Sequence, residues 1–394
     1  MSRHRQALGV TAAACIVALI GASSAASAAS GASGAPPSGP GHLKPGHLEQ
    51  IAAPTSHLLT SRATQVLSTA SVTRWSHTLV DGTSSFTYTM VGKDPTVVQA
   101  TPSTTIKTEL VPLIIKFAGD TWNPTVGDSC DTTSALIRTE NSPIFKSKAY
   151  TLGGTATGSG QYVDIFQRAN YWADTKPTGI NPGYHVKLGL KVLPAVTINV
   201  PLADAATGTT PCGNHLLGAV ENGWLDNYLR STVIPGLKAQ GVGPKTFPLF
   251  LLGNVVQYVG NTANCCVLGY HNSYQVTAGV QTFGIAMYDN SANFTGSQDV
   301  SALSHEVAEW MDDPFGNNPT RPWGNIGQVT GCQNNLEVGD PLSGTVQSVT
   351  TVGHAYHVQE LAFTSWFYHQ TPSSGINGWY SNYGTFTAAA ATCP

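Results

Sequence analysis

One short segment of this 394-residue chain carries an imidazole and two carboxylates at helical spacing. It reads SHEVAEW and contains His305, Glu306 and Glu309. Helical residues four apart lie within about 40° of each other around the axis, so His305 and Glu309 can offer two ligands to one metal ion. Glu306 lies about a quarter turn away, where a carboxylate can act on a water at the metal without ligating it. The same arrangement underlies H-E-x-x-H zinc sites, whose first Glu is the general base. The segment therefore predicts a metal site with His305 and Glu309 as ligands and Glu306 as the catalytic residue.

A catalytic zinc needs a third protein ligand. The downstream segment LEVGDP supplies two carboxylates three residues apart, Glu337 and Asp340. Either can be the ligand while the other orients a neighbouring group. A metzincin site is excluded, because position 315 is Phe where a third His is required and no Met follows the helix. A weaker candidate is His271, which we expect to bind substrate or to stabilise an oxyanion.

The competing interpretation of SHEVAEW is a solvated helix face with Glu309 exposed. Composition argues against it, since only 10% of the chain is charged and yet four acids crowd one short stretch. The net charge of −3 also excludes a basic nucleic-acid footprint. We therefore expect no nucleic-acid partner.

The element that must position these groups is a helix over residues 299–313. Val300, Leu303, Val307 and Met311 form one stripe that should face the core, with His305 and Glu309 facing a cleft. Pro314 ends the helix through its fixed φ and missing N–H.

Elsewhere, the spacing at which apolar residues recur differs between the two halves of the chain. Alternating apolar residues predict strands in the first half, including 86–90, 110–117, 186–192 and 196–200, with a helix over 161–173. The second half predicts a helix over 214–232, strands over 247–259 and 281–288, a loop-rich stretch to 352 and a short helix over 357–367. The expected class is α+β, with a β-rich N-terminal half followed by a zincin-like half that has a backing helix, a mixed sheet and the metal-site helix. We expect a β-rich region over 63–200 and a zincin-like region over 201–394, which can also form one continuous domain.

The amino terminus has the order of a secretory signal peptide over residues 1–28: two arginines, a short apolar run, and small residues ending at Ala28. Residues 29–62 are rich in Gly, Ser and Pro and predict a disordered linker or pro-segment. The expected localisation is secreted and extracellular, with no membrane partner. Cys15 is removed with the signal peptide. The six remaining cysteines, an even number in an exported chain, predict up to three disulfides, and their pairing is left open. These candidates are Cys130, Cys212, Cys265, Cys266, Cys332 and Cys393.

Three segments carry a family resemblance: GYH at 269–271, SHEVAEWMDDP at 304–314 and EVGDP at 337–341. They resemble uncharacterised secreted bacterial proteins with a zincin-like HExxE helix, over roughly residues 75–394. In segment order the chain is also similar, more faintly, to plant phosphate-induced (exordium-like) secreted proteins. The first resemblance implies a metallopeptidase-type scaffold, and the second implies an extracellular role.

The sequence thus predicts a secreted metal-dependent hydrolase, a zincin-like metallopeptidase that uses a metal-activated water on a peptide or protein substrate. Zinc is the expected ion, with Ca²⁺ or Mn²⁺ as alternatives because carboxylates suit harder ions. The alternative function is a non-catalytic secreted binding or cell-surface protein on a degenerate zincin-like fold. The oligomeric state is left open.

Overall fold

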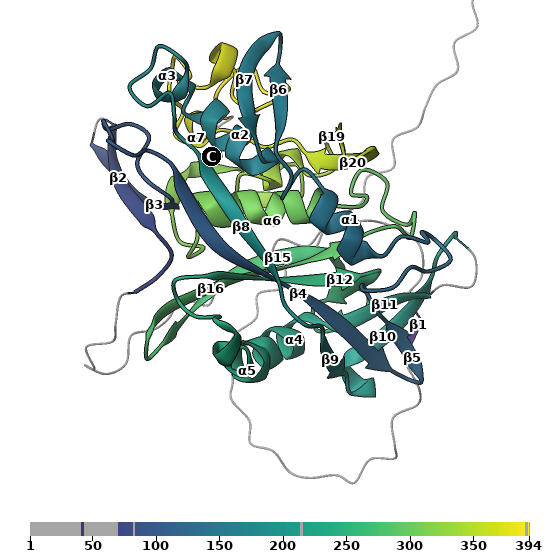
Figure 1. The fold of residues 1–394 in the computed structure, drawn as a ribbon. Helices are drawn as coiled ribbons and strands as arrows, with labels where there is room; N and C mark the ends of the chain where they lie inside the picture. The colour runs from purple at the N-terminus through teal and green to yellow at the C-terminus, as the bar shows by residue number, and fades with distance from the viewer. Residues whose placement is uncertain (1–40, 43–69, 82, 213–215, 391–392, 394) are drawn as a thin grey trace, which may run out of the picture. The chain divides into compact units, whose positions relative to one another are not determined.

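The computed structural model describes residues 41–42, 70–81, 83–212, 216–390 and 393. The predicted signal peptide lies outside these residues, as does the predicted linker except for Gly41 and His42. The described residues belong to one compact unit, Gly39–Pro394. Within it the fold is α+β and rich in strands, as the sequence predicts (Figure 1).

The largest sheet in the described part of the chain joins seven strands from both halves. The order β15-β16-β12-β4-β5 forms its path, and β8 and β9 also pair with β4. The bounds are β4 Thr104–Phe117, β5 Asp120–Trp122, β8 Val186–Val192, β9 Val196–Asn199, β12 Phe247–Gly253, β15 Gly269–Val276 and β16 Gly279–Tyr288.

This sheet is mixed, and its centre is parallel. β4 runs parallel to β12, β8 and β9, and β12 runs parallel to β16. β5 and β15 are antiparallel to their neighbours. β12 and β16 are buried along nearly their whole length, as expected for strands covered on both faces. Because β4 precedes residue 200 and β12 follows it, the sheet connects the two regions that the sequence separates.

A second sheet and four hairpins complete the strands of the described residues. The second sheet has the order β1-β10-β11-β13-β14, with bounds Gly41–His42, Ala205–Thr209, Leu216–Glu221, Val255–Tyr258 and Cys265–Val267. The hairpins are β2 Arg74–Asp81 with β3 Ser84–Val91, β6 Lys148–Leu152 with β7 Thr155–Gly160, β17 Pro319–Ile326 with β18 Val329–Asn335, and β19 Val346–Thr351 with β20 His354–Gln359.

The α-helices are short, and α6 is the longest in the described residues. Their bounds are α1 Ala135–Asn141, α2 Tyr162–Asn170, α3 Trp172–Thr175, α4 Asn222–Tyr228, α5 Ile234–Gly236, α6 Ser301–Asp312 and α7 Thr364–Phe367. Short 3₁₀ or π turns cover Leu202–Asp204, Leu229–Val233, Lys238–Gln240, Asp340–Leu342 and Ile376–Gly378. None of these helices is long and apolar enough to cross a membrane.

Helix α6 confirms the helix that the sequence predicts over 299–313, and it lies over the sheet face made by β15 and β16 (Figure 1). Its predicted stripe of Val300, Leu303, Val307 and Met311 is buried. The rest of the helix is buried too, because β20, β3 and α2 pack against it. Trp310 stacks on Phe247 of β12 with ring centroids 3.6 Å apart. The competing interpretation of a solvated helix face is therefore wrong.

The predicted helix over 214–232 is wrong at its start. Leu216–Glu221 is strand β11, paired with β10 and β13, and the helix begins at Asn222. The four-residue spacing that predicted a helix is real only for Trp224 and Tyr228, whose rings stack 5.2 Å apart. A short, fully apolar run fits a buried strand as well as a helix, and here the neighbouring strands decide.

The prediction for the C-terminal quarter is wrong in two places. Residues 314–352 are not mainly loop, since β17, β18 and β19 lie there. The expected helix over 357–367 is split into the end of strand β20 and the single turn α7. Both segments alternate polar and apolar residues only weakly, and their strands form by pairing with the neighbouring strand in the hairpins β17–β18 and β19–β20.

The six cysteines form three disulfides, the maximum the sequence allows. The pairs are Cys130–Cys212, the adjacent Cys265–Cys266, and Cys332–Cys393. Disulfides of this number are typical of proteins that mature in an oxidising compartment.

Candidate metal centre

Strand β20 is tied to helix α6 and to the residue Asp299 just before it, and this brings a glutamine beside the first histidine of the motif. The backbone N–H of His357 donates to the Asp299 carboxylate over 2.9 Å. The backbone N–H of Gln359 donates to the Ser304 hydroxyl, also over 2.9 Å. These contacts fix Gln359 against the helix at Ser304, the residue before His305.

The hydrogen bonds of Gln359 determine which nitrogen of His305 carries its proton. The Gln359 amide N–H donates to the Gly339 carbonyl over 2.6 Å, so its Oε1 faces the imidazole. That oxygen accepts from His305 Nδ1 over 3.0 Å. The lone pair of a neutral His305 is then on Nε2.

His305 Nε2 faces two carboxylates in the protein interior. It lies 3.0 Å from Glu309 Oε2 and 3.5 Å from Asp340 Oδ1, and all three side chains are buried. When His305 is neutral, three acceptor atoms converge here with no donor among them, which is unfavourable unless a cation lies between them. The segment 337–341 thus brings Asp340 to ion-pair distance of His305.

Main-chain and amide groups hold the carboxylates of this set. The Gly339 N–H donates to Glu309 Oε1 over 3.1 Å. The Gln328 amide donates to Asp340 Oδ1, and the Gln333 amide donates to Asp340 Oδ2 over 3.4 Å. Such outer partners orient ligating groups in metal sites.

Glu337, the other candidate third ligand, lies beside this set with a different environment. Its Oε1 accepts from the Asn335 amide over 2.8 Å, and its Oε2 is buried without a hydrogen-bond partner. Burial, followed by the charge of Glu309, raises the pKa of Glu337 well above its ordinary value. In the described residues Glu337 forms no ion pair with either histidine.

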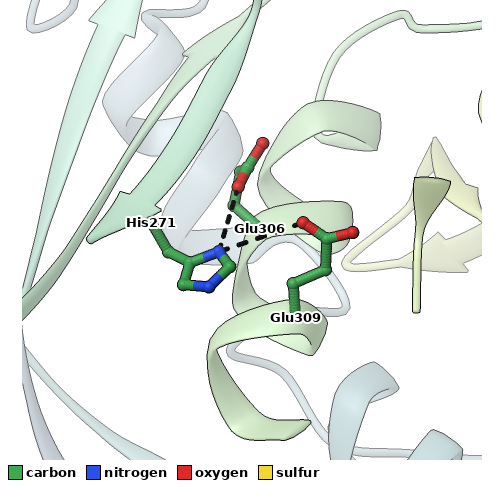
Figure 2. Close-up of side chains that lie close together, drawn as sticks. All are labelled: His271, Glu306 and Glu309. Atoms are coloured by element: carbon green, nitrogen blue, oxygen red, sulfur yellow. Dashed lines mark ion pairs between the residues drawn. The ribbon is translucent and has the colours of Figure 1, made fainter. Parts of the chain in front are cut away.

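The second histidine, His271 on β15, faces the other side of the motif (Figure 2). Its Nε2 donates to the Asp313 carbonyl over 3.1 Å, since a carbonyl can only accept. Its Nδ1 therefore carries the lone pair in the neutral ring, and lies 3.6 Å from Glu306 Oε2 and 3.9 Å from Glu309 Oε2. His271 Nδ1 and Glu306 Oε2 are buried and have no hydrogen-bond partner.

The titration behaviour of these groups reflects an excess of negative charge. Burial by itself would lower the pKa of His305, but the charge of Glu309 and the hydrogen bonds of Asp340 and Glu309 raise it well above its ordinary value. Burial raises the pKa of Glu309, opposed by the charge of His305. The pKa of His271 is also raised, because Glu306 and Glu309 outweigh the effect of its burial.

The space beside the motif is small. A pocket with about 30 Å³ of room is lined by His305, Glu306, Gly269, Gln328 and Gln359, among others. Liquid water occupies about 30 Å³ per molecule, so the pocket has room for one or two waters and not for a peptide. The prediction that His305 and Glu309 face an open cleft is therefore wrong: β20 and the segment around Gly339 cover them.

Two sets of side chains in the described residues have the residue types and the spacing of metal ligands. One is His305, Glu309 and Asp340, and the other is His271, Glu306 and Glu309; the candidate ligand atoms within each set lie within 4.8 Å of one another. The sequence predicts His305, Glu309 and Asp340 but assigns His271 to substrate. It gives no indication of Gln328, Gln359 or Gly339, because their roles depend on contacts between distant segments.

Comparisons of the chain with protein-family models, with curated proteins and with solved structures find no match. The resemblance to secreted zincin-like proteins therefore stays a prediction.

Proposed function

We propose that this chain is a secreted metal-dependent hydrolase whose ion is held by His305, Glu309 and Asp340. The observation that carries the proposal is the convergence of His305 Nε2 with Glu309 Oε2 and Asp340 Oδ1 at 3.0 and 3.5 Å in a buried site. Two ligands about 2.0 Å from one ion at a tetrahedral angle lie about 3.3 Å apart. The two distances bracket this value, so the residues fit a metal ion.

The donor set bears on the identity of the ion. One imidazole and two carboxylates suit zinc, and they favour harder ions such as Mn²⁺ or Ca²⁺ more than three histidines would. When bound, a divalent ion would supply Lewis acidity and make a neighbouring water more acidic. Zinc is the expected ion, with Mn²⁺ and Ca²⁺ as alternatives.

Glu306 is the proposed proton acceptor. It lines the small pocket together with His305. A Cβ placed on Gly269 would lie 3.1 Å from Glu306 Oε1, so this oxygen lies beside the pocket wall formed by that glycine. A carboxylate beside a pocket the size of one or two waters can accept a proton from water held there. Gln359 supports this chemistry by keeping the His305 lone pair on Nε2.

Export and a peptide substrate are also part of the proposal. Three disulfides support an oxidising destination. A peptide or protein substrate follows from the expected zincin-like scaffold, and it requires the pocket to widen. The pocket wall contains Cys266, Val267 and Leu268, so β14 and the residues after it are the segment that must move.

The small size of the pocket specifically favours a second candidate function. A buried site that admits only water fits an ion that stabilises a non-catalytic secreted binding or cell-surface protein. In that case removal of the ion lowers the melting temperature, but the chain hydrolyses nothing.

The experiment that separates the two compares the parent with Glu306→Gln on a mixture of quenched fluorescent peptides. Gln is nearly isosteric but cannot accept a proton, so turnover should fall at least 100-fold while the ion held by His305, Glu309 and Asp340 is retained. Glu140→Gln, on helix α1 away from the site, is the matched control and should keep full turnover.

Peptide cleavage by the parent that a chelator abolishes would support the hydrolase. Equal activity in Glu306→Gln and parent would remove Glu306 from the mechanism. A stabilising ion without cleavage of any peptide would favour the non-catalytic function.

A further inference from the structure

We infer a second cation site adjoining the first, formed by His271, Glu306 and Glu309, so that Glu309 bridges two ions. The inference rests on the proposed function for the first ion, at His305, Glu309 and Asp340. It adds His271 to the metal ligands and gives Glu306 a second role.

The unpartnered nitrogen of His271 points to this site. The imidazole is 96% buried, and the Asp313 carbonyl holds its Nε2–H, so the ring cannot turn Nδ1 elsewhere without losing that hydrogen bond. Nδ1 faces Glu306 Oε2 and Glu309 Oε2, and neither His271 Nδ1 nor Glu306 Oε2 has another partner (Figure 2). A buried lone pair directed at two carboxylate oxygens is the arrangement of a ligand set without its cation.

The distances agree with one ion at each set. His271 Nδ1 lies 3.6 Å from Glu306 Oε2 and 3.9 Å from Glu309 Oε2, close to the roughly 3.3 Å expected between two ligands of one tetrahedral ion. The two sets share Glu309 and no other residue. Carboxylates bridge ion pairs about 3.5–4 Å apart in two-metal enzymes.

Several acidic side chains lie near the two sets of ligands. Glu306, Glu309, Asp313, Glu337 and Asp340 lie close enough for their charges to act on one another. Buried charges without compensation are strongly unfavourable.

The two roles of Glu306 use different oxygens. Oε2 faces His271 and would bind the second ion, while Oε1 lies beside Gly269 at the wall of the small pocket and would accept the proton from water. Ligands of this kind, one imidazole with two carboxylates, suit Zn²⁺ or Mn²⁺.

The test is a count of ions in the full mature chain. Chelator-treated protein is titrated with Zn²⁺ by calorimetry, and the bound zinc is then counted by elemental analysis. We expect two ions per chain in the parent and one in His271→Gln, with His77→Ala on β2 as a control that keeps two. Circular dichroism checks that His271→Gln is folded, and Glu306→Gln serves as a second variant that should also bind one ion. Titration with Mn²⁺ should give the electron paramagnetic resonance spectrum of an exchange-coupled ion pair in the parent, and this spectrum should be absent from both variants.

The outcomes separate this inference from the proposed function. One ion in the parent, retained in His271→Gln and lost in His305→Gln, would overturn the second site and leave the first. Two ions in both the parent and His271→Gln would also overturn the assignment to His271. No ion in the folded parent would overturn both proposals.

Discussion

Gly339 lies so close to the imidazole of His305 that a Cβ at position 339 would come within 2.5 Å of Nδ1. The same residue donates its N–H to Glu309 and accepts the Gln359 amide at its carbonyl. Gly339 is therefore part of the wall that holds both His305 and Glu309, and the absence of a side chain there permits the close approach.

Gly339→Ala should displace His305 and weaken ion binding. We expect a loss of about 1–3 kcal/mol in the free energy of unfolding, as for overpacking of a filled interior, together with a marked fall in zinc affinity. Chemical denaturation and zinc titration of the variant measure both effects. The control is Gly243→Ala, where a Cβ meets nothing within 4 Å. Equal zinc affinity in Gly339→Ala and the parent would show that His305 is not held in place by Gly339.

Gln359→Leu should lower metal affinity without removing a ligand. Leu cannot accept a hydrogen bond from His305 Nδ1–H, so the ring loses the contact that keeps the lone pair on Nε2. Loss of such an outer partner typically weakens binding 10- to 100-fold. Competition with a chromogenic zinc chelator measures the change, with Gln347→Leu on β19 as the control. An unchanged affinity would mean that the tautomer of His305 does not depend on Gln359.

Removal of the Cys332–Cys393 disulfide should affect stability and ion retention together. The bridge joins Cys332 in β18, eight residues before Asp340, to Cys393 in the carboxyl-terminal segment. It closes a loop of 61 residues. A loop of that length predicts a stabilisation of about 4 kcal/mol. Cys332→Ser with Cys393→Ser should lose this stability and should release zinc faster.

The matched control for that pair is Cys130→Ser with Cys212→Ser, which opens a loop of 82 residues remote from Asp340. It should lose a similar stability while zinc release stays at the parent rate, as measured by stopped-flow chelation. Free thiols at Cys332 in the native protein, counted by mass spectrometry, would contradict the premise.

Asp312 should make the protein less stable as pH rises. Its carboxyl is fully buried and accepts from the Gln167 amide, and burial raises its pKa from 3.8 to about 7. A raised pKa in the folded state means that the folded protein binds the proton more tightly. The favourable contribution is therefore complete below about pH 4 and is lost as pH rises through 7.

Asp312→Asn should remove most of this pH dependence. At 1.36 kcal/mol per pKa unit, this group should lower the parent's free energy of unfolding by about 2–3 kcal/mol between about pH 5 and pH 8. The variant should lack this contribution to the pH dependence. Urea denaturation at both pH values with saturating zinc measures the difference. The exposed Asp120→Asn is the control, and a parent curve as flat as that of Asp312→Asn would contradict the buried, protonated carboxyl.

The parts of the site that depend on one helix are predictable from sequence. The period of Val300, Leu303, Val307 and Met311 defines α6, and four-residue spacing puts His305 and Glu309 together. The segment around Asp340 could be named as a source of a third carboxylate. The choice between Asp340 and Glu337 could not be predicted from the sequence, because it depends on how a turn after β18 packs against the helix.

The rest depends on contacts between distant segments. β11 resembles part of a helix until β10 and β13 are known to flank it. The closure of the site results from β20, which the sequence predicts as partly helical. His271 reaches the motif because β15 and β16 lie beneath α6, a relationship that no local pattern encodes.

The measurement that tests the central claim most directly is elemental analysis of the mature protein purified without chelator, paired with His305→Gln. We expect at least one tightly bound zinc, manganese or calcium ion per parent chain, and loss of one ion in a variant that remains folded. A folded parent chain that contains no stoichiometric divalent metal and takes up none on titration would contradict the metal centre.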